Sequence, residues 1–89
     1  MPYVLITLKP DGTEEKKVYS KRPPLSDMQA AVGGLIEQIP WITTYKGEKC
    51  IAYCNEDGIG LELPENYHVS LGPWLNPIYG NVIFEIKRR

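Results

Sequence analysis

The chain has 89 residues, with eleven acidic and ten basic side chains and a formal net charge of −1 at pH 7. A chain of this length builds a single modest core, so residues 1–89 are predicted to form one domain. The pI of about 5.8 argues against a nucleic acid polymer as partner, because domains that bind phosphate backbones are usually strongly basic. The sequence shows neither a membrane-spanning apolar run nor a signal-peptide pattern, so no membrane partner is expected and a cytoplasmic location is predicted.

The N-terminal part of the sequence predicts a β-hairpin. Residues 3–9 form an almost continuous apolar and β-branched run, which is typical of a strand covered on both faces. A Pro-Asp-Gly turn follows, and residues 13–20 then form a charged strand with weak alternation. Lysines on this second strand oppose pairing with another sheet, so we predict that it lies at a sheet edge.

Residues 23–34 predict one short helix with a marked start and end. A double proline holds the preceding chain extended, Ser26 is expected to cap the first turn, and a double glycine ends the helix. Met28 and Val32 lie four residues apart and share one apolar face. At about seven residues the helix is too short to be stable alone, so we expect it to pack on a sheet.

Three further strands are predicted, at residues 35–42, 49–54 and 80–86. Pro40 lacks an amide for the ladder, so the first of these strands should lie at an edge or carry a bulge. Residues 59–63 could pair briefly, and residues 64–79 are expected to form an irregular loop with its own apolar anchors. The element order is strand, strand, helix, strand, strand, loop, strand. This order predicts an α+β fold, with a mainly antiparallel sheet of about five strands and one short helix on one face.

The cysteines and the single histidine do not predict a chemical centre. Cys50 and Cys54 lie four residues apart in a predicted strand, where their Cα atoms would be about 13 Å apart. A disulfide requires less than about 7 Å, so we expect two buried free thiols. Together with His68 they match no zinc-site spacing. The sequence also has no nucleophile elbow and no phosphate-binding glycine motif, so no metal, cofactor or catalytic residue is predicted, and we expect that the protein is not an enzyme.

Three blocks of the sequence resemble a known family. The blocks are residues 24–29 (PLSDMQ) with 32–37 (VGGLIE), residues 54–58 (CNEDG) with 63–66 (LPEN), and residues 78–83 (IYGNVI). In this order they are similar to the family catalogued as domain of unknown function 3846, which occurs in phages, plasmids and their bacterial hosts. The family has no assigned activity. The resemblance therefore implies a context: a small accessory protein of a phage or mobile element that resides in the host cytoplasm, where some such proteins act on host defences.

Candidate binding residues come from the aromatic side chains and a few polar ones. Tryptophan and tyrosine are enriched at interfaces because they bury a large area at small entropic cost, although part of them must fill the core here. Asn55 lies at the end of a predicted strand and Asn66 at the start of a possible helical turn. Each could mark a ligand site, or its side chain could bond neighbouring backbone in a turn. The candidates are Arg22, Trp41, Tyr45, Asn55, Asn66, Trp74 and Tyr79.

Two functions are consistent with these features. The first is a self-associating protein-interaction module that modulates a host or defence protein through an aromatic face and the 64–79 loop. The second is a homo-oligomeric sequestering protein that stacks a small nucleotide signal on Tyr or Trp, holds its phosphates with Arg22, Lys21 or backbone amides, and blocks host immunity. The slightly acidic composition favours the first. A hollow at a symmetric interface between protomers, where an aromatic and a basic side chain converge, would favour the nucleotide. A flat, exposed apolar surface without basic residues would favour a protein partner.

Overall fold

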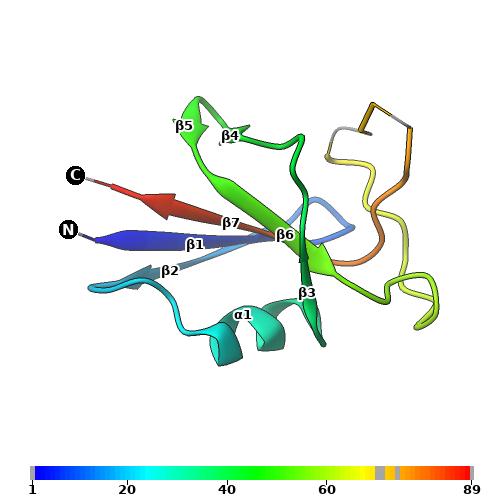
Figure 1. The fold of residues 1–89 in the computed structure, drawn as a ribbon, viewed down its shortest axis with the longest axis horizontal. Helices are drawn as coiled ribbons and strands as arrows, with labels where there is room; N and C mark the ends of the chain where they lie inside the picture. The colour runs from blue at the N-terminus through cyan, green and yellow to red at the C-terminus, as the bar shows by residue number, and fades with distance from the viewer. Residues whose placement is uncertain (1, 70–71, 74, 89) are drawn as a thin grey trace.

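The computed structural model describes residues 2–69, 72–73 and 75–88. Its strands are β1 (Tyr3–Leu8), β2 (Glu14–Tyr19), β3 (Ile36–Gln38), β4 (Thr44–Tyr45), β5 (Glu48–Lys49), β6 (Ile51–Asn55) and β7 (Val82–Lys87), and helix α1 (Leu25–Val32) lies between β2 and β3. Five strands form one antiparallel sheet in the order β2-β1-β7-β6-β3, as Figure 1 shows. The predicted α+β fold is confirmed. A second sheet of two strands, β4 and β5, was not predicted.

The C-terminal strand β7 lies at the centre of the large sheet, between β1 and β6. Both neighbours are antiparallel to it, and residues from Val82 to Ile86 are buried. Strand β1 is buried on both faces from Val4 to Leu8, as its apolar run predicted. The charged strand β2 lies at the edge of the sheet, which confirms the prediction from its lysines.

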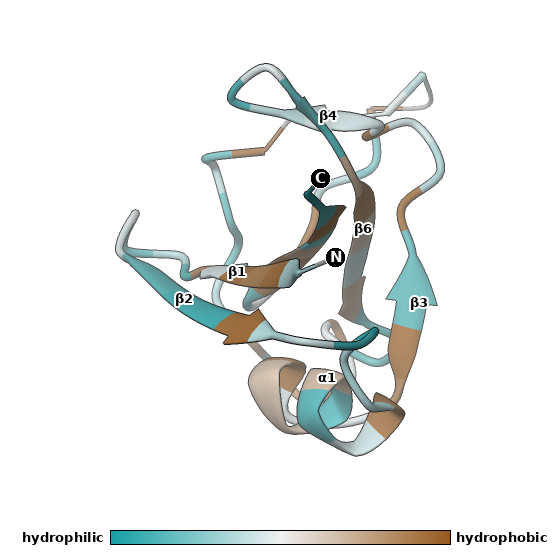
Figure 2. Cartoon of the chain, turned by 90° about the vertical axis from the view of Figure 1, so that its left-hand side faces the viewer, coloured by the Kyte–Doolittle hydropathy of each residue, from teal (hydrophilic) through white to brown (hydrophobic). Residues whose placement is uncertain are grey.

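The sheet carries an apolar layer on each face. On the face that we call the helix face, Met28 and Val32 of α1 pack against Leu5, Tyr53 and Ile83. Figure 2 shows α1 lying across this face. On the opposite face, which we call the loop face, the chain between β3 and β6 and the chain before β7 cover the strands. The buried loop-face residues are Val4, Ile6, Leu8, Ile39, Cys50, Ala52, Cys54, Ile78, Val82, Phe84 and Ile86.

Helix α1 begins earlier than the sequence predicted. The amides of Asp27 and Met28 both donate to the carbonyl of Pro24, which is the N-cap residue, and the structure shows no side-chain cap bond. The expectation that Ser26 caps the helix was therefore wrong, because this residue already lies within the first turn. The predicted glycine end is confirmed, since Gly33 has a left-handed φ of 79°. No helix in the described chain is long and apolar enough to cross a bilayer.

The segment after α1 leaves the sheet sooner than predicted. Strand β3 ends at Gln38, two residues before Pro40, which has no amide to continue a ladder. The chain then crosses the loop face, where Ile39 is 1% exposed, and forms the β4–β5 hairpin. Its turn is at Lys46 and Gly47, which both have positive φ, as a two-residue hairpin turn of type I′ requires. Residues 59–63 form turns in place of the brief strand that was predicted.

Candidate functional site

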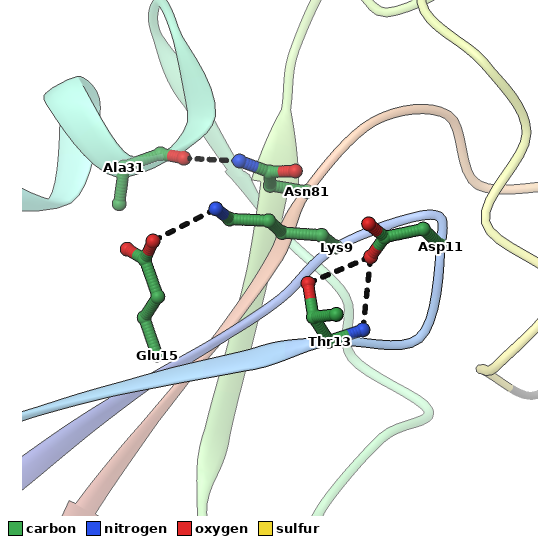
Figure 3. Close-up of polar contacts among 6 residues, drawn as sticks. All are labelled: Lys9, Asp11, Thr13, Glu15, Ala31 and Asn81. Carbon is green, nitrogen blue, oxygen red and sulfur yellow. Dashed lines mark hydrogen bonds and ion pairs between the residues drawn. The ribbon is translucent and has the colours of Figure 1, made fainter.

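A hollow of about 670 Å³ lies on the helix face between α1 and the β1–β2 hairpin. Several of its polar side chains are engaged by the fold: Lys9 Nζ lies 2.7 Å from a carboxylate oxygen of Glu15, and Asn81 Nδ2 donates to the backbone carbonyl of Ala31 at 2.9 Å (Figure 3). The nearby turn is closed by the Asp11 carboxylate, which accepts from the amide and the hydroxyl of Thr13. These contacts fasten the hairpin and the helix, so most of the polar lining already serves the fold.

Two adjoining hollows of about 580 and 400 Å³ lie on the loop face beside β3. We call them together the aromatic groove. Both are lined by Glu37, Trp41, Cys54 and Ile78. The larger hollow extends over β3 and Pro73, and the smaller one extends to Tyr79 and the turn after β6. The groove therefore lies where the sheet edge meets the chain that leads into β7.

The two aromatic residues of the groove pack against glycines that leave no room for a side chain. A Cβ on Gly72 would lie 2.6 Å from Cδ2 of Trp41, so the half-buried indole packs directly on this backbone. A Cβ on Gly58 would lie 2.9 Å from Cβ of Tyr79. In both pairs the partners are more than twenty residues apart in sequence, so the tertiary fold and not local sequence sets the shape of the groove.

The groove is acidic. Glu37 contributes a carboxylate from β3, and Glu56 and Asp57 contribute two more from the turn after β6. Among the described residues that line it there is no lysine or arginine. Burial, followed by the nearby charge of Glu37, raises the pKa of the Cys54 thiol to about 11. A thiol with this pKa stays protonated at neutral pH and is a poor nucleophile.

Strand β3 presents an open backbone edge next to the groove. The Ile39 amide donates to the Ala52 carbonyl, and in an antiparallel ladder such bonded pairs alternate with unbonded ones. The register pairs Glu37 with Cys54, which is therefore a bonded pair. The backbone N–H and C=O groups of Ile36 and Gln38 consequently point away from β6. They point to the free edge of the sheet, where β3 is the last strand.

The two candidate asparagines are buried and fasten loops. Asn55 Nδ2 donates to the Val32 carbonyl at 3.0 Å, and its Oδ1 accepts from the Asp57 amide at 2.7 Å. Asn66 Nδ2 donates to the carbonyls of Leu8 and Gly80, at 3.1 Å each. Its Oδ1 accepts from the amide two residues later, at 3.1 Å. The two Oδ1 bonds are the turn bonds that the sequence offered as the alternative to a ligand site, whereas the Nδ2 bonds join segments that are distant in sequence.

Tyr45 and Arg22 are also engaged by the fold. The Tyr45 ring stacks on Phe84 with centroids 4.0 Å apart, and its hydroxyl donates to Glu14. Burial, together with this bond, raises the pKa of Tyr45 to about 12. Arg22 donates from Nε to the buried carboxylate of Glu85 at 2.9 Å. It lines a fourth hollow, of about 420 Å³, at the end of the sheet where the chain begins and ends. We call this hollow the terminal pocket.

The structure thus brings three predicted candidates together. Trp41, Asn55 and Tyr79 line the aromatic groove, whereas Arg22 lies in the terminal pocket and Trp74 lies outside the described residues. Sequence reasoning missed Glu37 and, in the terminal pocket, Tyr3, Lys49 and Lys87. Alternation in the 35–42 segment could have assigned a face to the glutamate, but no local pattern indicates that the first and last strands pair. In the part of the chain that the structure describes, no three Asp, Glu, His or Cys side chains cluster as metal ligands would.

The family is decided by one comparison. Residues 4–85 match the family described as Domain of unknown function (DUF3846). The chain belongs to the DUF3846 family. The match spans nearly all of the sheet core and the aromatic groove, and it contains all three sequence blocks that resemble the family. Searches of curated proteins and of solved structures found no significant match.

Proposed function

We propose that this DUF3846 protein is a non-enzymatic protein-interaction module whose aromatic groove binds a basic, extended segment of a partner protein. One observation carries the proposal: a groove lined by Trp41 and Tyr79 has an acidic rim, lacks a basic side chain among its described lining residues, and adjoins an open strand edge. The resemblance of the sequence supplies the context, an accessory protein of a phage or mobile element that modulates a host or defence protein in the host cytoplasm.

Affinity in this proposal comes from the apolar part of the groove. Aromatic side chains in desolvated pockets dominate the binding energy of most interfaces. Here Trp41 and Tyr79 are half-buried and Ile78 is buried, so the rings are fixed before a partner arrives. A preformed surface lowers the entropic cost of binding. The partner segment therefore needs an apolar or aromatic side chain that reaches these rings.

Specificity comes from the carboxylates. Glu37, Glu56 and Asp57 give the groove three negative charges with no cation among the described lining residues. Opposite charge on a partner mainly raises the association rate and excludes wrong partners. A lysine or arginine on the bound segment meets these conditions. A phosphate group does not, which is why the groove supports a protein partner over the nucleotide alternative.

The open edge of β3 supplies the binding mode. An extended segment that adds to a sheet edge gains main-chain hydrogen bonds, and alternate side chains then enter the adjacent hollow. Ile36 and Gln38 offer the required N–H and C=O groups. The opposite edge, β2, carries lysines that protect it, whereas β3 has none. Leu35, which directly precedes β3, is 62% exposed, and Ile59, in the turn after β6 that lines the groove, is 74% exposed.

Selection from a random heptapeptide library tests the proposal. We expect enriched peptides to alternate lysine or arginine with apolar residues, and binding to weaken by about tenfold or more in Glu37→Arg, since a repulsive charge replaces an attractive one. The matched control is Glu15→Arg, the same charge change on the exposed strand β2. Hydrogen exchange of the Ile36 and Gln38 amides should slow when the peptide binds. Failure to enrich any peptide, enrichment of acidic peptides, or equal effects of both variants would contradict the proposal.

Self-association remains part of the proposal and has its own measurement. Native mass spectrometry of the purified protein reads the number of subunits directly. A stable dimer or larger species supports the homo-oligomer, and a monomer at micromolar concentration rejects it.

A further inference from the structure

The terminal pocket differs in chemistry from the aromatic groove. It is lined by Tyr3 of β1, Ile51 of β6, and Glu85 and Lys87 of β7, together with Arg22 and Lys49. Tyr3 pairs with Lys87 across β1 and β7, and Ile51 pairs with Glu85 across β6 and β7. Cross-strand partners share a face. These four side chains therefore lie together on the helix face, and no described lining residue of the pocket comes from α1.

The charges of the pocket leave an excess of cations. Glu85 is only 6% exposed, and the Arg22 guanidinium pairs with it. Lys49 and Lys87 have no carboxylate partner among the described residues. Lys87 Nζ lies 5.9 Å from the centroid of the Tyr3 ring, a distance at which a cation is attracted to the ring face. The pocket therefore carries two positive charges after its one internal ion pair is counted.

Arg22 keeps donors for a further partner. Its contacts with Glu85 and with the Tyr53 hydroxyl use Nε and Nη2. A guanidinium has five N–H donors in a planar fork, which suits phosphate and carboxylate groups. The side chain is 61% exposed. The buried Glu85 thus fixes the position of Arg22, while the remaining N–H donors of the guanidinium stay exposed to solvent.

The floor of the pocket is apolar. Ile51 is 39% exposed two residues after Lys49, and the Tyr3 ring is half-buried beside Lys87. The volume of about 420 Å³ is within the range of about 300–1,000 Å³ that is usual for small-molecule sites. An aliphatic side chain and an aromatic ring below two unpaired ammonium groups suit a ligand that has a flat apolar body and an anionic group.

We propose that the terminal pocket binds a small aromatic anion of nucleotide size, with its ring against Ile51 and Tyr3 and its anionic group at Lys49, Lys87 and the outer donors of Arg22. This site is independent of the aromatic groove and does not rest on the protein-binding function proposed above. The terminal pocket brings basic and aromatic side chains together, as a nucleotide site requires. It lies at the end of the sheet that holds both chain termini.

An NMR titration with adenosine 5′-monophosphate tests the site. We expect saturable amide shifts at Lys49, Ile51 and Lys87 and a dissociation constant below about 1 mM. Adenosine alone and inorganic phosphate alone should each bind about tenfold more weakly, because each supplies only half of the contacts. Shifts spread over other surfaces, absence of saturation, or equal binding of either fragment would overturn the proposal.

Two double variants distinguish binding at the terminal pocket from a general effect of net charge. The double variant Lys49→Gln/Lys87→Gln should weaken the nucleotide by about tenfold or more. The control Lys16→Gln/Lys17→Gln removes the same charge from exposed positions on β2 and should change binding by less than about twofold. Equal loss in both would show that only net charge matters and would overturn the site. Glu37→Arg should leave nucleotide binding unchanged, so failure of this site and failure of the groove give different results.

Discussion

The Arg22–Glu85 ion pair joins an exposed cation to a buried anion, and breaking it tests how the segment before α1 is held. The Glu85 side chain is 6% exposed and the Arg22 side chain 61%. Arg22 Nε donates to one carboxylate oxygen at 2.9 Å, and Nη2 lies 3.4 Å from the other. Arg22→Met keeps most of the aliphatic stem that packs on the sheet and removes the charge. It leaves a carboxylate buried on β7 without its cation.

The size of the effect follows from the unequal exposure. A hydrogen bond to a charged group contributes about 1.5–3 kcal/mol, and breaking a fully buried pair costs about 3–5 kcal/mol. Water can replace part of the exposed guanidinium in this case, so we expect Arg22→Met to lower the free energy of unfolding by about 2 kcal/mol. Adding Glu85→Gln removes the unpaired charge, and we expect the double variant to regain more than half of that loss.

Urea unfolding followed by circular dichroism measures both effects. With a slope of about 1–1.5 kcal/mol per molar for a chain of this size, Arg22→Met should lower the midpoint by about 1.5 M. Lys9→Met is the control, because it breaks the Lys9–Glu15 pair, in which both side chains are exposed. The reasoning is refuted if Arg22→Met and Lys9→Met shift the midpoint equally, or if Glu85→Gln fails to restore stability in the Arg22→Met background.

Three further predictions concern the loop face. Gly72→Ala puts a methyl group 2.6 Å from Cδ2 of Trp41. We therefore expect the free energy of unfolding to fall by about 1–3 kcal/mol and the tryptophan emission to shift. Unchanged emission would contradict the packing of Trp41 on Gly72. Burial raises the pKa of Cys54 to about 11. This thiol should therefore react with a disulfide reagent at pH 8 far more slowly in the folded protein than after unfolding. Rapid reaction in the folded protein would contradict this prediction. Burial raises the pKa of Tyr45 from 10.0 to about 12. The folded state therefore favours the neutral phenol: this stabilisation is complete below pH 10 and is lost as the pH rises to 12, so Tm should fall over that interval, and less steeply in Tyr45→Phe.

Features set by short-range sequence were predictable. The apolar run of β1 and the lysines of β2 indicated a covered strand beside an edge strand, and both positions are confirmed. Met28 and Val32 indicated the buried face of α1, which packs on the sheet as expected. The helix start was missed by two residues because proline and serine can both stand at the start of a helix, and the sequence pattern does not decide between them.

The candidate site was only partly predictable because its shape depends on long-range contacts. Trp41 and Tyr79 were chosen for their chemistry alone. Their meeting in one groove requires Gly72, whose backbone the Trp41 ring touches, and Gly58, whose backbone packs against Cβ and the main chain of Tyr79. The end of β3 before Pro40 sends the chain across the loop face, which no periodic pattern in residues 35–42 reveals. Likewise, the pairing of the first strand with the last creates the terminal pocket, and no local signal encodes it.

The net charge of −1 conceals a separation of charge along the molecule. The acidic groove lies toward the end that holds the chain before β7, and the cationic terminal pocket lies at the other end, where both termini lie, along a longest extent of 35 Å (Figure 1). Fields of exposed charges decay over about 8 Å at physiological salt, so each site acts on its own ligand. A basic partner segment is attracted to one end and a small anion to the other. A nearly neutral composition therefore argues against a long polyanion but places no limit on two small sites of opposite charge.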